Sequence, residues 1–299
     1  MTIKESAMTA PPLIAPRLSS KKFTGRRRRL STSAKVAGGF LLLMVLVALI
    51  APVLSPYDPI VGDATQRLLP LLSDGHVLGT DGQGRDVLSR LIWGARPSLL
   101  AGIIPVIIGG GVGTVLGLVA GLGSARVNSV VMRILDVFYA FPAVMLAIAI
   151  SAALGPGISN AILALSLVNI PPVARVAETE VLRIKDAAFM ETARLSGASW
   201  FSIAFRQALP AAGPGILVFC TGLIGLSIVY AAGLGFLGLG LTPPTAEWGL
   251  MVNELRQYTF SAPIVALVPA VLILIVSIAC NALGDGLRDR MDVRMEARA

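Results

Sequence analysis

The residues that could do chemistry in this chain are few, and they gather in short polar segments between long apolar stretches. One such segment runs from Arg175 to Arg206 and contains Glu191, Thr192, Ala193 and Gly197. Leu209 and Pro210 follow shortly after it. A polar segment of this length has to lie outside the lipid. Its apolar residues could lie on the membrane surface or fill a groove of a partner.

A second polar group precedes the long apolar stretch that begins near residue 97. Its charged and small residues are Asp81, Gly84, Arg85, Asp86 and Arg90. Asp86 and Arg90 are four residues apart, which predicts a short helix entering the next apolar segment. Asp81 and Asp86 lack the spacing of a calcium-binding loop, so we expect an external contact or a stabilising ion pair.

Several other kinds of site are not supported by the pattern. The single His76 cannot build a histidine cluster for a metal, no nucleophile and base stand together, and no G-x-x-x-x-G-K-[ST] motif occurs. Gly233-x-Gly235-x-x-Gly238 fits the dinucleotide pattern without the strand that the motif requires. Cys220 and Cys280 both fall in apolar stretches, where packing is the expected role. We therefore expect no catalytic residue, cofactor or metal on this chain.

The elements that position these residues are set by the composition. Hydrophobic residues make up 55% of the chain, charged residues 14%, and the mean hydropathy is +0.79. Charged residues are absent from 36–57, 97–125, 137–174, 207–246 and 257–284. About 20 apolar residues span a bilayer as a helix, and Gly155-Pro156-Gly157 divides the longest stretch with a turn. The sequence predicts an all-α membrane protein with six spans, near 36–54, 98–122, 134–154, 158–175, 211–236 and 264–284.

The distribution of lysine and arginine gives the orientation. Of the 25 such residues, all but Arg67, Arg85, Arg90, Arg96 and Arg256 fall at the two ends, beside the loop near 126–133 or within 175–206. Positive residues concentrate on the cytoplasmic side, so both termini are expected there, with 55–97 and 237–263 outside. The same topology explains the isoelectric point of about 10.1 better than nucleic-acid binding does. Arg26 to Arg29 could also be a twin-arginine signal, although the next apolar run is long enough to anchor the chain.

This topology divides the chain into four parts. Residues 1–35 are expected to be a disordered basic cytoplasmic arm, 36–97 the first span with an external segment, 98–285 a core of five spans and 286–299 a cytoplasmic tail. Within the core, the cytoplasmic loop is expected at about 176–210. There, Asp186 would cap a helix over 187–196, Gly197 would end it in the left-handed conformation, and Ser199 would cap a second helix over 200–208. The apolar residues Trp200, Phe201, Ile203 and Phe205 could lie on the membrane or fill a partner's groove.

Small and helix-breaking residues mark the core helices. Gly109, Gly113, Gly117 and Gly121 repeat at four-residue intervals, so they share one helix face; the face could contact another subunit or pack internally. Pro142 and Pro171-Pro172 interrupt two spans, and such breaks either expose backbone to a transport path or curve the helix. The polar residues Tyr139, Asn160, Ser166 and Asn169 could line a path or bond between helices.

Together these motifs resemble the permease chains of ABC importers for dipeptides, oligopeptides and nickel, in particular the second, C-type permease chain. The resemblance covers about 36–292 and rests on the Glu191-to-Pro210 pattern, on Gly79-Thr80-Asp81 with Gly84 to Arg90, on Gly235 to Gly240 with Pro243 to Gly249, and on Gly284 to Asp289. Thr192 stands where the family more often has alanine, and Gln207 where it has an apolar residue.

The resemblance implies a type I importer permease fold in the bacterial inner membrane. The chain would form half of a path for di- or oligopeptides, with nickel or glutathione as alternative substrates. It implies a homologous permease, two ATPase subunits that bind ATP and Mg²⁺, and an external solute-binding protein as partners, besides the lipid bilayer. Glu191 would contact the ATPase and Gly197 would allow the bend. The alternative classes are a stand-alone carrier or channel, which usually has ionisable residues within its spans, and a membrane enzyme, for which no site is evident.

Overall fold

The structure is a computed structural model that describes residues 31–296. Five of its helices are long and apolar enough to cross a membrane, and two shorter helices joined at a bend give a sixth crossing when they are counted as one span. The single crossings are α1 (Thr32–Leu49), α3 (Val87–Leu122), α6 (Ile158–Ile184), α9 (Leu209–Phe236) and α11 (Pro263–Glu296), and the bent pair is α4 (Ala125–Tyr139) with α5 (Ala143–Leu154). The prediction of an all-α membrane protein is confirmed, with five candidate spans, or six when the bent pair is counted as one.

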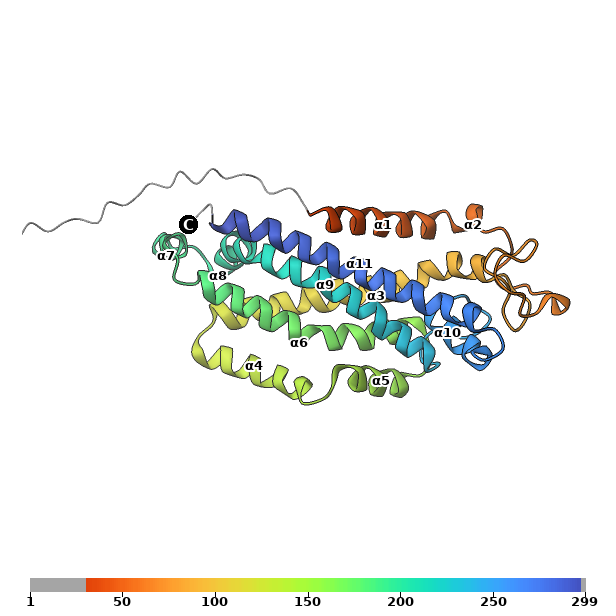
Figure 1. Ribbon diagram of the computed structural model, residues 1–299. Coiled ribbons are helices and arrows are strands. Elements are labelled where there is room, and N and C mark those ends of the chain that lie inside the picture. Colours follow the sequence, from red (N-terminus) through yellow and green to blue (C-terminus); the bar gives the residue numbers. More distant parts are fainter. Residues whose placement is uncertain (1–30, 297–299) are drawn as a thin grey trace, which may run out of the picture.

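The shorter elements gather at the two ends of the bundle. One end carries α7 (Ala188–Leu195) and α8 (Trp200–Ser202) together with the start of α1 and the end of α11 (Figure 1). The other end carries α2 (Ala51–Leu54), the segment 55–86 with η1 (Ala64–Gln66), α10 (Trp248–Leu255) and η3 (Arg256–Tyr258). This separation places both ends of the described chain and the polar loop on one side, as the charge distribution predicts.

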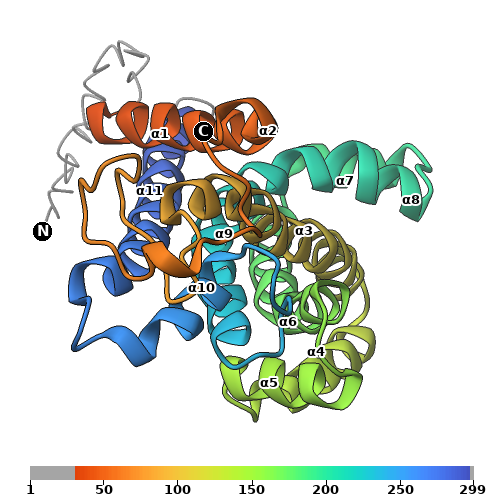
Figure 2. The same cartoon turned by 90° about the vertical axis from the view of Figure 1, so that its right-hand side faces the viewer.

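The core is built around α3 and α6, with α9 against both of them and α11 against α9. In the end-on view of Figure 2, α1 lies at one edge of the bundle beside α11, and the bent pair lies at the opposite edge below α6. The four glycines of the four-residue repeat lie on α3 where it meets α6. A Cβ at Gly113 would stand 2.7 Å from the Ile170 carbonyl oxygen and 2.9 Å from the Val173 Cβ. This face therefore packs within the chain, because only glycine lets the two helix backbones approach so closely.

Gly113→Ala is therefore expected to destabilise the bundle by about 1–3 kcal/mol, since the added methyl forces the backbone of α6 away. Gly111→Ala is the matched control, because a Cβ at Gly111 meets nothing within 4 Å on the same helix. Thermal unfolding of the purified chain in detergent measures both changes. Equal melting temperatures for the two variants would contradict this account of the α3–α6 contact.

The third crossing is broken rather than continuous. The sequence predicts a span over 134–154, whereas α4 starts at Ala125, ends at Tyr139, and meets α5 at an angle of 81°. Pro142 is the residue immediately before α5, where its ring and missing N–H prevent the helix from continuing. The predicted interruption at Pro142 is present, but the prediction of one helix was wrong.

Several predicted boundaries also move. α1 begins within the expected arm, at Thr32, where the Ser31 hydroxyl accepts from the Ala34 N–H. α3 begins at Val87, within the expected external segment, and α6 continues to Ile184, so the polar loop between α6 and α9 spans 185–208. α11 runs to Glu296, so the expected tail is helical as far as it is described. The arginines at 26–29 and most of the basic arm lie outside the described residues.

Arg96 of α3 links the first helix, α1, to the rest of the bundle through hydrogen bonds. Its guanidinium donates to the carbonyl of Ala48 and, at 2.8 Å, to that of Leu49, which are the last carbonyls of α1. These carbonyls have no partner within their own helix, and the guanidinium also lies 5.5 Å from the ring centroid of Trp93. Arg96 therefore caps α1 from α3.

Candidate functional site

A cavity of about 740 Å³ lies along the bundle beside the bent pair. Its walls come from the ends of α4 and α5, from the middle of α6, and from α9 and α11. Most of the lining is apolar, with Phe141, Phe219 and Leu226 among its larger side chains. The volume falls within the range of about 300–1,000 Å³ that small-molecule sites usually occupy.

Few polar groups reach this cavity. Tyr139 and Asn169 line it, as do Tyr230, Ser277 and Asn281, and Asp285 and Arg288 are the charged residues of its lining within the described part of the chain. The Asn169 amide nitrogen is buried without a hydrogen-bond partner among the described residues. An apolar wall with a few polar groups can hold a small polar solute without binding it tightly.

Of the four polar residues that were predicted either to line a transport path or to bond between helices, two line the cavity and two do not. Tyr139 and Asn169 are at the cavity. Asn160 instead donates to the carbonyls of Leu154 and Gly155 at 2.9 and 3.0 Å, which closes the turn between α5 and α6. The Ser166 hydroxyl donates to the Ile162 carbonyl of its own helix at 2.7 Å. Pro171 and Pro172 also line the cavity, within α6.

The polar loop at the end of the bundle forms two short helices. α7 ends at Leu195, and Gly197 follows with φ of +73°, the left-handed conformation that favours glycine. The Ser199 hydroxyl accepts from the Ser202 N–H and starts α8, which continues through the π-helical turn η2 (Ile203–Ala208) into α9. The expected cap by Asp186 is wrong: the N-cap position is Ala187, and no side chain caps α7.

This loop presents both polar and apolar groups at its surface. Glu191, Thr192 and Pro210 are exposed, whereas Ala193 and Leu209 are half-buried. Met190 is fully buried and holds α7 to the bundle, while Leu195 is 83% and Phe201 70% exposed. Ile203 is buried beneath α8, so it belongs to the core and not to the outer surface. The exposed residues form a protruding surface that the rest of the described chain leaves uncovered.

At the opposite end, a buried charge network joins the external segment to α10. The Arg85 guanidinium donates to Asp81 at 2.6 Å and to Glu254 at 3.0 Å, and Arg90 donates to the same Glu254 oxygen at 2.6 Å. Both arginines are at most 2% exposed. Gly84 stands beside them with φ of +74°. Glu254 is the residue of this network that the sequence analysis missed, because it lies 164 positions beyond Arg90.

Asp86 has a different role from the one its spacing suggests. It does not pair with Arg90; one of its oxygens accepts from the Ser89 N–H at 2.7 Å, which caps α3. Its other oxygen lies 2.8 Å from His76 Nδ1, and His76 Nε2 lies 2.9 Å from Gln66 Oε1. The predicted helix is present, with Asp86 as its N-cap. Of the two aspartates for which an ion pair was one expected role, Asp81 pairs with Arg85.

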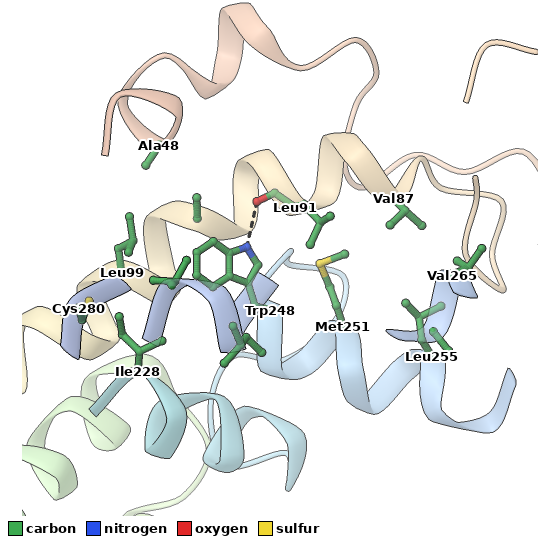
Figure 3. Packing of buried hydrophobic residues seen from close by; sticks show 14 residues of the cluster. Ala48, Val87, Leu91, Leu99, Ile228, Trp248, Met251, Leu255, Val265 and Cys280 are labelled. Carbon is green, nitrogen blue, oxygen red and sulfur yellow. Dashed lines mark hydrogen bonds between the residues drawn. The ribbon is translucent and has the colours of Figure 1, made fainter. Parts of the chain in front are cut away.

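Glu247 and Trp248 anchor α10 to α3. The Glu247 carboxylate accepts from the N–H groups of Gly249 and Leu250 and from the Ser98 hydroxyl. Burial raises the pKa of this carboxyl, against the lowering effect of those three donors. Figure 3 shows the buried Trp248 indole donating to the Leu91 carbonyl, at 3.0 Å, among the apolar side chains of the core.

The fold and these sites define a multi-pass membrane component with a side cavity and a protruding polar loop. A family model described as "Binding-protein-dependent transport system inner membrane component" matches residues 113–297, and one described as "N-terminal TM domain of oligopeptide transport permease C" matches 25–70. The chain belongs to the family of inner membrane components of binding-protein-dependent transport systems. It is a permease subunit of an ABC importer in the bacterial inner membrane.

Relatives with assigned substrates are similar over nearly the whole chain. The glutathione transport system permease protein GsiD of Salmonella paratyphi A is 45% identical over 98% of this chain and 97% of its own length. GsiD of Pectobacterium atrosepticum is 43% identical over 91% of this chain and 90% of its own length.

Solved structures show the same architecture. Two inward-facing crystal forms of the MetNI methionine ABC transporter align with TM-scores of 0.57 and 0.55, at 22% and 21% identity. The alignments cover 69% and 67% of this chain and 97% and 96% of the matched chains. At this identity the likeness shows the fold alone, which is that of a type I importer permease.

Proposed function

We propose that this chain forms half of a translocation path for short peptides of the glutathione type. The observation that carries the proposal is the cavity beside the bent pair, with its apolar walls and its few polar groups. The similarity to glutathione permeases over 97% and 90% of their lengths supports this substrate class. A homologous permease would supply the facing wall. Longer oligopeptides and nickel chelates are the alternatives within the same family.

The protruding loop is the proposed contact with an ATPase subunit. Glu191 supplies a polar group and Leu195 and Phe201 supply apolar surface, on a helix pair that Gly197 bends. Closure of two ATPase subunits on ATP, which they hold with Mg²⁺, would push on two such loops and reverse the side to which the path opens. An external solute-binding protein would deliver the peptide and do most of the selecting.

Uptake into proteoliposomes tests the substrate. With the chain reconstituted beside its co-encoded permease, ATPases and binding protein, we expect ATP-dependent, saturable accumulation of radiolabelled glutathione. Unlabelled nickel chelates and long oligopeptides are expected to compete at least about tenfold less well, a difference of roughly 1.4 kcal/mol in binding. Omission of ATP is the control for leakage. Accumulation of an oligopeptide or of nickel, with none of glutathione, would overturn this substrate assignment.

A further inference from the structure

The external segment 55–86 reaches beyond α10 at the outer end of the bundle, where Figure 1 draws it in orange. Residues 69–80 of this segment form a hairpin, in which the Leu72 N–H donates to the Val77 carbonyl at 3.0 Å. α3, which follows the segment, runs for about ten residues, a rise of about 15 Å, before its charge-free stretch begins. The hairpin is therefore held in the external solution, away from the lipid.

Leu72 combines an unfavourable backbone conformation with an exposed apolar side chain. Its φ is +62°, in the left-handed region that is unfavourable for any residue with a Cβ. Leu72 is 82% exposed, and Val77, which lies opposite it in the hairpin, is 55% exposed. Packing within the described chain therefore does not account for this placement, and strained residues of this kind cluster at binding sites.

The hairpin is nevertheless held in one position by its buried side. His76 is 7% exposed, and its two ring nitrogens lie 2.8 Å from Asp86 and 2.9 Å from Gln66. Its ring also packs against the ring of Tyr57, with the centroids 4.7 Å apart. Asp86 is the N-cap of α3, so the hairpin is joined to the start of a core helix. An apolar residue on a fixed support loses little conformational entropy when a partner covers it.

The position and the charge of the segment indicate what covers Leu72. The family of this chain is described as binding-protein-dependent, and a solute-binding protein that delivers from outside meets this end of the bundle first. The exposed charged residues of the segment are three aspartates and one arginine, namely Asp58, Asp63, Asp74 and Arg67. A complementary surface therefore offers a small apolar pocket with basic residues around it.

We propose that Leu72 and Val77, with Asp74 at the turn between them, form a docking contact for the solute-binding protein. The binding protein would receive Leu72 in its apolar pocket, and a basic residue beside the pocket would pair with Asp74. This contact rests on the proposed function for the identity of its partner, and it adds the surface at which that partner docks.

The affinity of the solute-binding protein for the importer tests this contact. Binding of the glutathione-loaded protein to the purified importer complex in nanodiscs is measured for the unaltered chain and for two variants. Leu72→Asn keeps a residue that tolerates the left-handed conformation but removes the apolar side chain, so we expect the affinity to fall at least about tenfold. Leu72→Met keeps an apolar side chain of similar volume and is expected to stay within about twofold. Thermal unfolding is expected to be the same in both variants.

Val53→Asn is the matched control, since Val53 is 89% exposed but lies on α2, directly after α1. We expect it to leave the affinity unchanged. Equal affinities for Leu72→Asn and the unaltered chain, or an equal loss in Val53→Asn, would overturn the docking contact alone. Failure of the unaltered complex to bind any solute-binding protein would remove the proposed partner and this contact with it. Binding of that protein only when it carries a solute other than glutathione would remove the proposed substrate instead.

A fluorophore on Leu72→Cys distinguishes a protein partner from the membrane surface. We expect quenching by aqueous iodide, and protection from iodide when the loaded solute-binding protein is added. Quenching by nitroxide-labelled lipids of the nanodisc, without protection by the protein, would place the hairpin on the membrane and contradict the proposal.

Discussion

Replacing Gly197 with aspartate is expected to abolish ATP-driven uptake while the chain still inserts in the membrane. Gly197 has φ of +73°, and a Cβ there would meet nothing within 4 Å. The substitution therefore adds modest backbone strain of about 1–2 kcal/mol and no clash within the chain. Its main effect is a new carboxylate at the tip of the loop, where the ATPase is proposed to dock. We expect uptake to fall at least about tenfold, within the usual range of coupling between sites.

The control for this variant is Gly155→Asp. Gly155 has φ of +86° and equally open surroundings, but it lies between α5 and α6 at the other end of the bundle. The two substitutions add the same charge and similar backbone strain. A difference in uptake between the two variants is therefore due to the position of the substitution. Retention of the ATPase subunits on the purified complex is measured beside uptake. Normal uptake by Gly197→Asp would contradict the docking role of the loop.

Replacing Glu254 with alanine is expected to destabilise the external end by about 3–5 kcal/mol, since it leaves buried charges without their partner. Glu254 is the acceptor shared by Arg85 and Arg90 at 3.0 and 2.6 Å. Asp81 alone would remain, 3.6 Å from the Arg90 Nε. The external segment should then become sensitive to protease at lower temperature. Thermal unfolding and limited proteolysis of the segment 55–86 measure the effect.

Asp136→Ala is the matched control for this change. Asp136 pairs with Arg175, but both side chains are about half exposed, and ion pairs of that kind contribute about 0–1 kcal/mol. Each substitution removes one carboxylate, which pairs with two buried arginines at Glu254 and with one exposed arginine at Asp136, so the variants differ in burial and in the number of partners. Similar losses of stability in both variants would show that the external network does not hold this end together.

Local patterns in the sequence predicted most of the membrane topology. The charge-free stretches predicted the spans. Burying a charge in lipid is costly for any segment, so each span can be recognised from its own residues alone. Gly197 and Ser199 were assigned correctly to a helix end and a helix start for a similar reason, since both features depend on a few neighbouring residues. The bend at Pro142 was recognised as an interruption, but its angle depends on packing against α6, which no local pattern contains.

Contacts between distant segments could not be predicted. The Asp86–Arg90 spacing allowed an ion pair, but Glu254 and Asp81 compete for Arg90, and the Ser89 N–H and His76 take Asp86 instead. Asp186 was the expected N-cap of α7, but Ala187 holds the N-cap position, and no side chain caps the helix. The cavity beside the bent pair is lined by five helices, and only Tyr139 and Asn169 of the four nominated polar residues line it.

Affinity purification of the tagged chain from its native membrane in mild detergent, with mass spectrometry of the bound proteins, tests the central claim most directly. We expect a homologous permease and two ATPase subunits to be recovered with the chain in fixed proportion. We also expect the ATPases to be reduced when Gly197 is replaced by aspartate. Recovery of the chain alone, or only with copies of itself, would contradict the proposal that it is half of an ATP-driven path.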